Sequence, residues 1–180
     1  NNISQLVRRL DLDMETYDSL KAGDLFDTFS MDCMQIQQYQ MNRYPYLFLD
    51  HVTEIQPGKF AKGYKHYTVN EWFFPVHYPT MPNVPGLLQL EALSHLAILT
   101  FLALPGNQGL ITNSLRVNNV KFLSRIVPGQ TFQMEAQLHS WRRGIAKCST
   151  QGHVNGEEVS SADWVFTIPS ILDKYKPSQP

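Results

Sequence analysis

The most apolar stretch of the chain, residues 86–103, predicts one long buried helix. Hydrophobic residues cover nearly all sides of this helix, and a helix of that kind has to be wrapped by the rest of the protein. Pro105-Gly106 ends it, because proline cannot continue a helix and glycine is common just beyond one. A few polar residues interrupt the stretch, which makes it a poor membrane span. They are Gln89, Glu91, Ser94 and His95.

The runs that follow this helix have the alternating pattern and the turn residues of antiparallel strands. They cover residues 110–112, 114–122, 131–141, 145–153 and 158–167. Asn155-Gly156 predicts a two-residue hairpin turn between the last two runs, and Arg143-Gly144 is a weaker turn signal. These runs therefore predict a meander of antiparallel strands.

A further hairpin is predicted before the helix. Residues 46–49 open a strand that residues 52–55 can continue. Pro57-Gly58 is the turn, and residues 59–69 alternate with aromatic side chains as the partner strand.

Residues 32–41 predict a short helix with Asp32 as its N-cap. The first thirty residues mix acidic and basic side chains with loose helical spacing, which predicts a peripheral arm. We therefore expect an N-terminal arm over 1–30, one domain over 31–170 and a C-terminal tail over 171–180. One apolar helix and about six antiparallel strands make the domain α+β, with a sheet curled around the central helix.

The composition narrows the function classes. The chain has 180 residues, 43% of them hydrophobic, which fits one folded domain. Its formal net charge is −1, so no general field attracts nucleic acid. Cys33 and Cys148 form neither a disulfide framework nor a zinc site, and no metal-binding spacing occurs. No signal-peptide pattern is visible, so a cytoplasmic location is the expectation.

Candidate chemistry gathers around the start of the apolar helix. Residues 71–86 contain four prolines and predict a stiff loop, and this loop carries His77. Histidine can act as a base near neutral pH. Glu91 lies among apolar residues in the second turn of the helix, where burial can keep a carboxyl protonated and able to act as an acid. Gly86 at the helix start offers backbone N–H groups that can stabilise an enolate-like oxygen.

A simpler interpretation of these residues is also open. His77 alone could be an ordinary loop histidine, and Glu91 a capping or interface carboxylate. The combination of the proline-rich loop, the glycine and the buried acid favours an active site that moves protons next to a carbonyl.

These motifs resemble the active-site region of the FabZ-type 3-hydroxyacyl-[acyl-carrier-protein] dehydratases. In that family a His and a proline-rich loop precede Pro-Gly, two or three apolar residues and a Glu, and His77 and Glu91 match that spacing. The resemblance extends over about residues 32–168 and includes further motifs in the same order. These are Arg43-Tyr44-Pro45 with Tyr46-Leu47-Phe48-Leu49-Asp50, Asn70-Glu71 with Phe73-Phe74, Lys121-Phe122, Val127-Pro128-Gly129 and Arg142-Arg143-Gly144.

The resemblance implies a hotdog fold with its active site at a dimer interface, where His77 of one protomer faces Glu91 of the other. It gives His77 the role of base on C2 of the substrate, Glu91 that of acid on the C3 hydroxyl, and the Gly86 amide that of oxyanion donor. The substrate would be carried on the phosphopantetheine of acyl carrier protein or coenzyme A, with no further cofactor. A homodimer or a trimer of dimers is expected. FabA-type relatives usually carry Asp as the acid, so Glu91 favours dehydration without isomerisation.

Two positions depart from the family pattern. Val76 stands where the family usually has Gly before the His, and its side chain could narrow the acyl tunnel. His95 stands where Gln is common, one helical turn after Glu91 and next to Ser94. His95 could hydrogen-bond Glu91 and hold it ionised. We slightly favour the alternative, in which His95 is a polar group of the dimer interface.

Four basic residues are a candidate surface for the carrier protein or phosphopantetheine, and a plain solvated face is the alternative. They are Lys121, Arg125, Arg142 and Arg143. The departures favour a specialised relative, for example in a polyketide, polyene or unusual lipid pathway. Two other functions stay open: a hotdog isomerase or thioesterase that uses the same pair, and a non-catalytic acyl-binding protein.

Overall fold

The computed structural model describes residues 26–175, and residues 1–25 and 176–180 lie outside this description. Most of the predicted N-terminal arm and half of the predicted tail are therefore outside the described residues. Within the described part, residues 29–31 form a strand, and the chain ends in two short helical elements, α5 (Pro169–Leu172) and η2 (Asp173–Tyr175). The division into arm, domain and tail stays a prediction.

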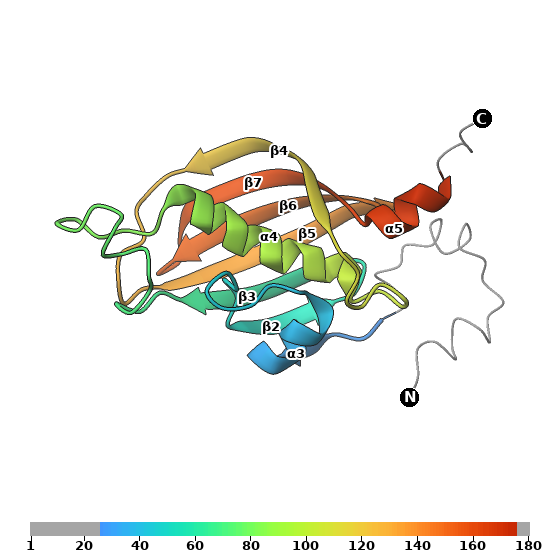
Figure 1. Cartoon of the computed structure of the whole chain (residues 1–180), viewed down its shortest axis with the longest axis horizontal. Helices are drawn as coiled ribbons and strands as arrows, with labels where there is room; N and C mark the ends of the chain where they lie inside the picture. The colour runs from blue at the N-terminus through green and yellow to red at the C-terminus, as the bar shows by residue number, and fades with distance from the viewer. Residues whose placement is uncertain (1–25, 176–180) are drawn as a thin grey trace.

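Seven antiparallel strands form one sheet, in the order β1-β2-β3-β5-β6-β7-β4. The strands are β1 (Phe29–Met31), β2 (His51–Gln56), β3 (Phe60–His66), β4 (Asn113–Phe122), β5 (Thr131–Arg142), β6 (Ile145–Val154) and β7 (Glu157–Thr167). The sheet curves around one helix, α4 (Gly86–Leu102), which lies across one of its faces (Figure 1). The predicted α+β architecture is confirmed, with β1 as a strand that the hydrophobic pattern does not reveal.

The central helix is buried as its sequence predicts. Twelve of its seventeen residues are buried, so almost every side of α4 is covered rather than one stripe. Gly63 in β3 lets the sheet approach the helix closely. A side chain at this position would begin 2.5 Å from the backbone oxygen of His51 and 3.2 Å from Leu96 of α4.

The short helix α3 (Cys33–Tyr39) confirms the predicted N-cap. The carboxylate of Asp32 accepts hydrogen bonds from the backbone N–H groups of Met34 at 2.9 Å and Gln35 at 2.8 Å. The side chain of Gln35 accepts in return from the N–H of Asp32 at 2.9 Å. This reciprocal capping box satisfies N–H groups that a helix start leaves without partners.

Two segments predicted as strands are not strands. Residues 46–49 run as irregular chain before β2, because the N–H of Phe48 donates to Nδ1 of His95 at 3.2 Å and not to a neighbouring strand. Residues 110–112 continue a turn in which the N–H of Leu110 donates to the carbonyl of Asn107 at 3.1 Å. In both segments, a backbone N–H bonds to a partner outside the sheet instead of to a neighbouring strand.

Two hairpin turns have the same backbone geometry. Asn155 and Gly156 have φ angles of 52° and 84°, as a type I′ turn requires. Arg143 and Gly144 have φ angles of 50° and 80°, so the weaker sequence signal forms the same kind of turn. The two glycines differ in their surroundings. A Cβ at Gly144 would lie 2.6 Å from the backbone nitrogen of Leu172, whereas a Cβ at Gly156 would meet nothing within 4 Å.

Strand β4 lies at one edge of the sheet and pairs only with β7. All of its residues are exposed, although several are large and apolar. They are Leu115, Val117, Val120 and Phe122. An unpaired apolar edge is a place where another chain can add. Within residues 26–175, no helix is both long and apolar enough to cross a membrane.

The two turn glycines provide a matched test of the packing of α5. Gly144→Ala has to move the backbone of Leu172, and it also places a side chain at positive φ, so we expect a loss of stability of about 3 kcal/mol or more. Gly156→Ala meets only the positive φ, and we expect a loss of about 1 kcal/mol. Urea unfolding of both variants measures the difference. Equal losses would contradict the close approach at Gly144.

Candidate active site

The loop between β3 and α4 holds His77 in one orientation. The backbone N–H of His77 donates to the carbonyl of Phe73 at 2.8 Å, and ring atom Nδ1 lies 3.1 Å from the carbonyl oxygen of Asn83. A carbonyl oxygen can only accept, so Nδ1 carries the proton. The other ring nitrogen, Nε2, then presents a lone pair. His77 is half-buried and is oriented as a base.

A buried lysine ties the start of this loop to the sheet. Nζ of Lys65, in β3, lies 2.7 Å from Oε1 of Glu71 and 3.4 Å from Oδ1 of Asp50. It also donates to the carbonyl of His66 at 2.9 Å. Lys65 is 8% exposed, so its charge depends on these partners. Because Glu71 opens the loop that carries His77, this ion cluster fixes the loop at its first residue.

Gly86 lies where the loop enters α4. Within the described residues, no acceptor pairs with the amides of Gly86 and Leu87, as expected for the first residues of a helix. A hollow of about 690 Å³ opens beside them, and Gly86, Leu87, Phe122 and Arg125 are among the residues that line it. A Cβ at Gly86 would lie only 3.0 to 3.2 Å from the ring of Phe122. Glycine therefore lets the ring approach the helix start.

Glu91 is paired with His95 on the same face of α4. Oε1 of Glu91 lies 3.0 Å from Nε2 of His95, as the spacing of four residues predicts. On the other side of the ring, the N–H of Phe48 donates to Nδ1 of His95 at 3.2 Å. Nδ1 is therefore the acceptor, and Nε2 carries the proton and donates it to Glu91. A second proton on the ring would place two donors face to face at Nδ1.

The surroundings of His95 bear on the two predicted interpretations. His95 is 2% exposed in a single protomer and stacks on the ring of Phe48, with 6.0 Å between ring centroids. The protomer alone buries and pairs this side chain, which speaks against its being a polar group of an interface. The predicted hydrogen bond between His95 and Glu91 is present, and whether it holds Glu91 ionised stays a prediction. The hydroxyl of Ser94 donates to the backbone carbonyl of Glu91 at 2.9 Å and is used within the helix.

Tyr46 lies near Glu91, and it belongs to a motif that the sequence analysis quoted without giving this residue a role. Partial burial, together with the nearby Glu91 carboxylate, raises the pKa of the Tyr46 phenol. Its ring lies 6.3 Å from that of His95 and 5.2 Å from that of Phe48, between ring centroids. The adjacent Arg43-Tyr44-Pro45 motif was a signal for this segment. No sequence signal reveals the Phe48 amide, because its role belongs to the backbone.

Within the described part of the chain, no hydrogen bond or ion pair joins His77 to Glu91, and neither of them lines the hollow at Gly86. Val76 is 72% exposed, so its side chain fills no tunnel in the single protomer.

The four predicted basic residues also separate. The strand register places Arg142 beside Ile145, Thr167 and Asn113, at one end of the sheet. Lys121 lies near the other end of β4, about 26 Å away along the strand, with Arg125 just beyond it. In one protomer these residues therefore do not form one basic surface, and among them only Arg125 lines the hollow at Gly86.

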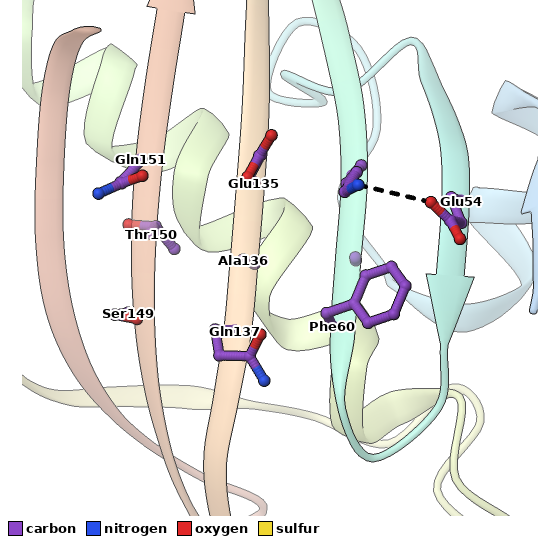
Figure 2. Close-up of a pocket in the computed structure, with 10 residues that line it drawn as sticks. Glu54, Phe60, Glu135, Ala136, Gln137, Ser149, Thr150 and Gln151 are labelled. Atoms are coloured by element: carbon purple, nitrogen blue, oxygen red, sulfur yellow. Dashed lines mark ion pairs between the residues drawn. The ribbon is translucent and has the colours of Figure 1, made fainter. Parts of the chain in front are cut away.

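A second hollow, of about 390 Å³, lies on the sheet away from these residues (Figure 2). Its lining is mostly polar and comes from β2, β3, β5 and β6, with an ion pair between Lys62 and Glu54 at 3.6 Å. None of the candidate residues lines it. Within residues 26–175, no group of three or more His, Cys, Asp or Glu side chains could hold a metal ion.

Comparison with known proteins identifies the family. The FabA-like domain family matches residues 41–163. The 3-hydroxyacyl-[acyl-carrier-protein] dehydratase FabZ of Bacillus licheniformis is 35% identical over 77% of this chain and 96% of its own length. The enzyme of the same name from Clostridium novyi is 36% identical over 74% of this chain and 94% of its own length. The chain belongs to the FabZ-type, FabA-like family.

A solved structure agrees with this assignment at the level of the fold. The dehydratase heterocomplex ApeI:P from Xenorhabdus doucetiae aligns with a TM-score of 0.63, over 77% of this chain and 95% of that chain. Its sequence identity is 11%, so the likeness concerns the fold alone. The hotdog fold and the family resemblance predicted from the sequence are confirmed.

The two histidines predict opposite tautomers in this FabZ-type protein. His77 is expected to carry its proton on Nδ1, because a carbonyl oxygen faces that nitrogen. His95 is expected to carry its proton on Nε2, because a backbone N–H faces its Nδ1. NMR of the isotope-labelled imidazole nitrogens measures this directly, with His77→Gln and His95→Gln to assign the signals. The same tautomer for both, or a charged His95 at neutral pH, would refute the proposed hydrogen-bond directions.

Proposed function

We propose that this protein removes water from a 3-hydroxyacyl thioester and yields the trans-2-enoyl thioester. The family membership supports this reaction, since its curated relatives are named as 3-hydroxyacyl-[acyl-carrier-protein] dehydratases. The observation that carries the proposal is the orientation of His77, whose Nδ1 is bound to the carbonyl of Asn83 so that Nε2 is left as a base.

In the proposed reaction, Nε2 of His77 takes the proton from C2 of the substrate. The N–H of Gly86 stabilises the oxygen of the thioester as negative charge develops on it. The C2=C3 double bond forms as the C3–O bond breaks, and Glu91 gives its proton to the departing hydroxyl, which leaves as water. The proton held by His77 then returns to Glu91 through solvent, which restores the starting state.

The geometry around Glu91 agrees with its role as the acid. The N–H of His95 occupies Oε1 at 3.0 Å, which leaves Oε2 to carry the transferable proton. The Glu91 side chain is 31% exposed and can therefore be reached from outside the protomer. His95 is a positioning group in this proposal.

We infer that two copies of the chain complete each site, with His77 from one and Glu91 from the other. The lack of any bond between these residues in the described part of one protomer supports this arrangement. The exposed apolar edge of β4 offers a surface that a second copy would bury. Whether such dimers assemble further stays a prediction.

The thioester is proposed to arrive on the phosphopantetheine of acyl carrier protein, with coenzyme A as the alternative carrier. Arg125 lines the hollow at Gly86, where it could contact an acidic carrier or a phosphate, whereas Lys121 lines a separate hollow on the sheet. Arg142 and Arg143 lie elsewhere in the protomer and are not needed for this contact. The absence of a cofactor and a cytoplasmic location remain predictions from the sequence. A polyketide or unusual lipid pathway also remains a prediction.

Replacing either member of the pair tests the reaction. We expect His77→Ala and Glu91→Gln each to lower enoyl thioester formation about a hundredfold or more, because each removes a proton-transfer group. Absorbance of the enoyl thioester follows the rate, and mass spectrometry separates loss of water from thioester cleavage. His139→Ala is the matched control, since His139 is exposed and bonds only Ser149. Unchanged turnover in both site variants would contradict the proposed reaction.

Mixing the two inactive variants tests the shared site. A hybrid of a His77→Ala chain and a Glu91→Gln chain contains one site with both groups intact. Random exchange of subunits should therefore recover up to about a quarter of the wild-type activity, because half of the dimers are hybrids and each has one intact site. Two preparations of His77→Ala mixed together should recover nothing. Hybrids that form but stay inactive would show that the pair acts within one protomer.

A further inference from the structure

Lys65 is a charged residue at a core position of the sheet. The alternation of β3 places it with Ala61 and Gly63 on the face that packs against α4. A strand position on the buried face ordinarily takes an apolar side chain, and an unpaired ammonium there is strongly unfavourable. Lys65 is 8% exposed, and within residues 26–175 no other lysine or arginine is buried. Its place in the core therefore needs a reason.

Stability alone does not supply that reason. The ammonium of Lys65 is fully paired, by the carboxylates of Glu71 and Asp50 and by the carbonyl of His66. Exchanging a buried ion pair for apolar side chains of similar size is often neutral or stabilising, because both charges lose their hydration on folding. What such a pair can add is a defined geometry between the two segments that it joins.

Glu71 depends on Lys65 more than Asp50 does. The Asp50 side chain is 36% exposed, and its Oδ2 also accepts from the backbone N–H of His66 at 2.7 Å. The Glu71 side chain is 16% exposed, and Nζ of Lys65 is the one hydrogen-bonding or ionic partner of its carboxylate within the described residues. Removing Lys65 would therefore leave a buried charge at the residue where the loop of His77 begins.

Backbone hydrogen bonds connect Glu71 to the proposed base. The carbonyl of Glu71 accepts from the N–H of Phe74 at 3.2 Å, and the carbonyl of Phe73 accepts from the N–H of His77 at 2.8 Å. These two overlapping turns pass the position of Glu71 along the chain to His77. A shift at Glu71 therefore reaches the imidazole within six residues.

A second connection runs through aromatic rings. Nζ of Lys65 lies 5.6 Å from the ring centroid of Tyr67, which is fully buried. The ring of Tyr67 meets that of Phe73 edge to face, with 6.0 Å between centroids. Both connections thus lead to Phe73, the residue whose carbonyl holds the backbone of His77.

We propose that Lys65 is a positioning residue for proton abstraction by His77. Its ion pair with Glu71 sets the start of the loop, and with it the point from which Nε2 of His77 reaches C2 of the substrate. Lys65 does not line the hollow at Gly86 and acts only through the loop. A misplacement of about 1 Å can cost about a hundredfold in rate, so a small shift is enough. This inference rests on the proposed dehydratase function.

Two variants separate positioning from stability. Lys65→Met keeps an unbranched side chain and removes the charge, and the double variant Lys65→Met, Glu71→Gln also removes the charge that would be stranded. We expect both to lower kcat for a 3-hydroxyacyl pantetheine thioester about ten- to a hundredfold, with KM near its wild-type value, because the base is displaced. The midpoint of urea unfolding should fall in the single variant and recover in the double variant.

The value of kcat in the double variant is decisive. A wild-type kcat there overturns the inference, whether or not Lys65→Met alone folds, because Lys65 would then serve only to neutralise Glu71. A raised KM with unchanged kcat also overturns it, because the base would then still be in place.

The ion pair of Lys62 and Glu54 is the matched control. It uses the same residue types and the same strand β3, but its atoms are 3.6 Å apart and its side chains are 48% and 43% exposed. Lys62→Met, Glu54→Gln should leave kcat and the urea midpoint close to their wild-type values, because exposed pairs contribute little. An equal loss of kcat in this control would overturn the assignment to Lys65.

NMR of the His77 imidazole nitrogens needs no turnover and separates this inference from the proposed reaction. In the wild-type protein the carbonyl of Asn83, 3.1 Å from Nδ1, selects one tautomer. In the Lys65→Met, Glu71→Gln protein we expect signals averaged between the two tautomers, because the ring no longer lies against that carbonyl. Unchanged His77 signals overturn the inference even if kcat falls. A wild-type protein that dehydrates no 3-hydroxyacyl thioester counts against the proposed function, and the His77 signals then decide the role of Lys65.

Discussion

The burial of one apolar helix is the constraint on which the rest of this structure depends. Because α4 has no polar side that could face solvent, the sheet curves around it. The segments before and after α4 in the sequence have to cover the rest of its surface. That enclosure brings residues 46–49 against the helix and places the Phe48 amide 3.2 Å from His95. The backbone of other segments therefore determines which partners the polar groups of α4 meet.

Two histidines show how those backbone groups control side-chain chemistry. A carbonyl, from Asn83, fixes the proton of His77 on Nδ1, and an N–H, from Phe48, excludes it from Nδ1 of His95. The same type of side chain is thus oriented as a proton acceptor at His77 and as a hydrogen-bond donor to Glu91 at His95. Neither assignment needs a charged neighbour. Each depends on a peptide group held rigidly by the fold, the first by the proline-rich loop and the second by the packing of Phe48 against α4.

Sequence periodicity predicted the parts of the fold that are locally encoded. The apolar run of α4, the N-cap at Asp32 and the Asn155-Gly156 turn depend on near neighbours, and all are confirmed. Residues 46–49 have the composition of a strand, but their partner is a histidine 47 residues away, which no local pattern reports.

The candidate site divides in the same way. Its motifs could be recognised from spacing, and the bond between Glu91 and His95 from helical geometry. The roles of the Phe48 amide and of Tyr46 depend on tertiary contacts. The separation of Arg142 from Lys121 follows from strand register.

The position of Glu91 on α4 also bears on the proposal that two copies of the chain complete each site. Glu91 lies on α4 with one carboxylate oxygen occupied and the other available, whereas His77 lies on a loop with no bond to it. In the proposed reaction, the acid comes from α4 and the base from the loop before it. The exposed apolar edge of β4 is a surface that a second copy would bury in the proposed dimer. Proton transfer from Glu91 would then belong to one protomer, and proton abstraction by His77 to its partner.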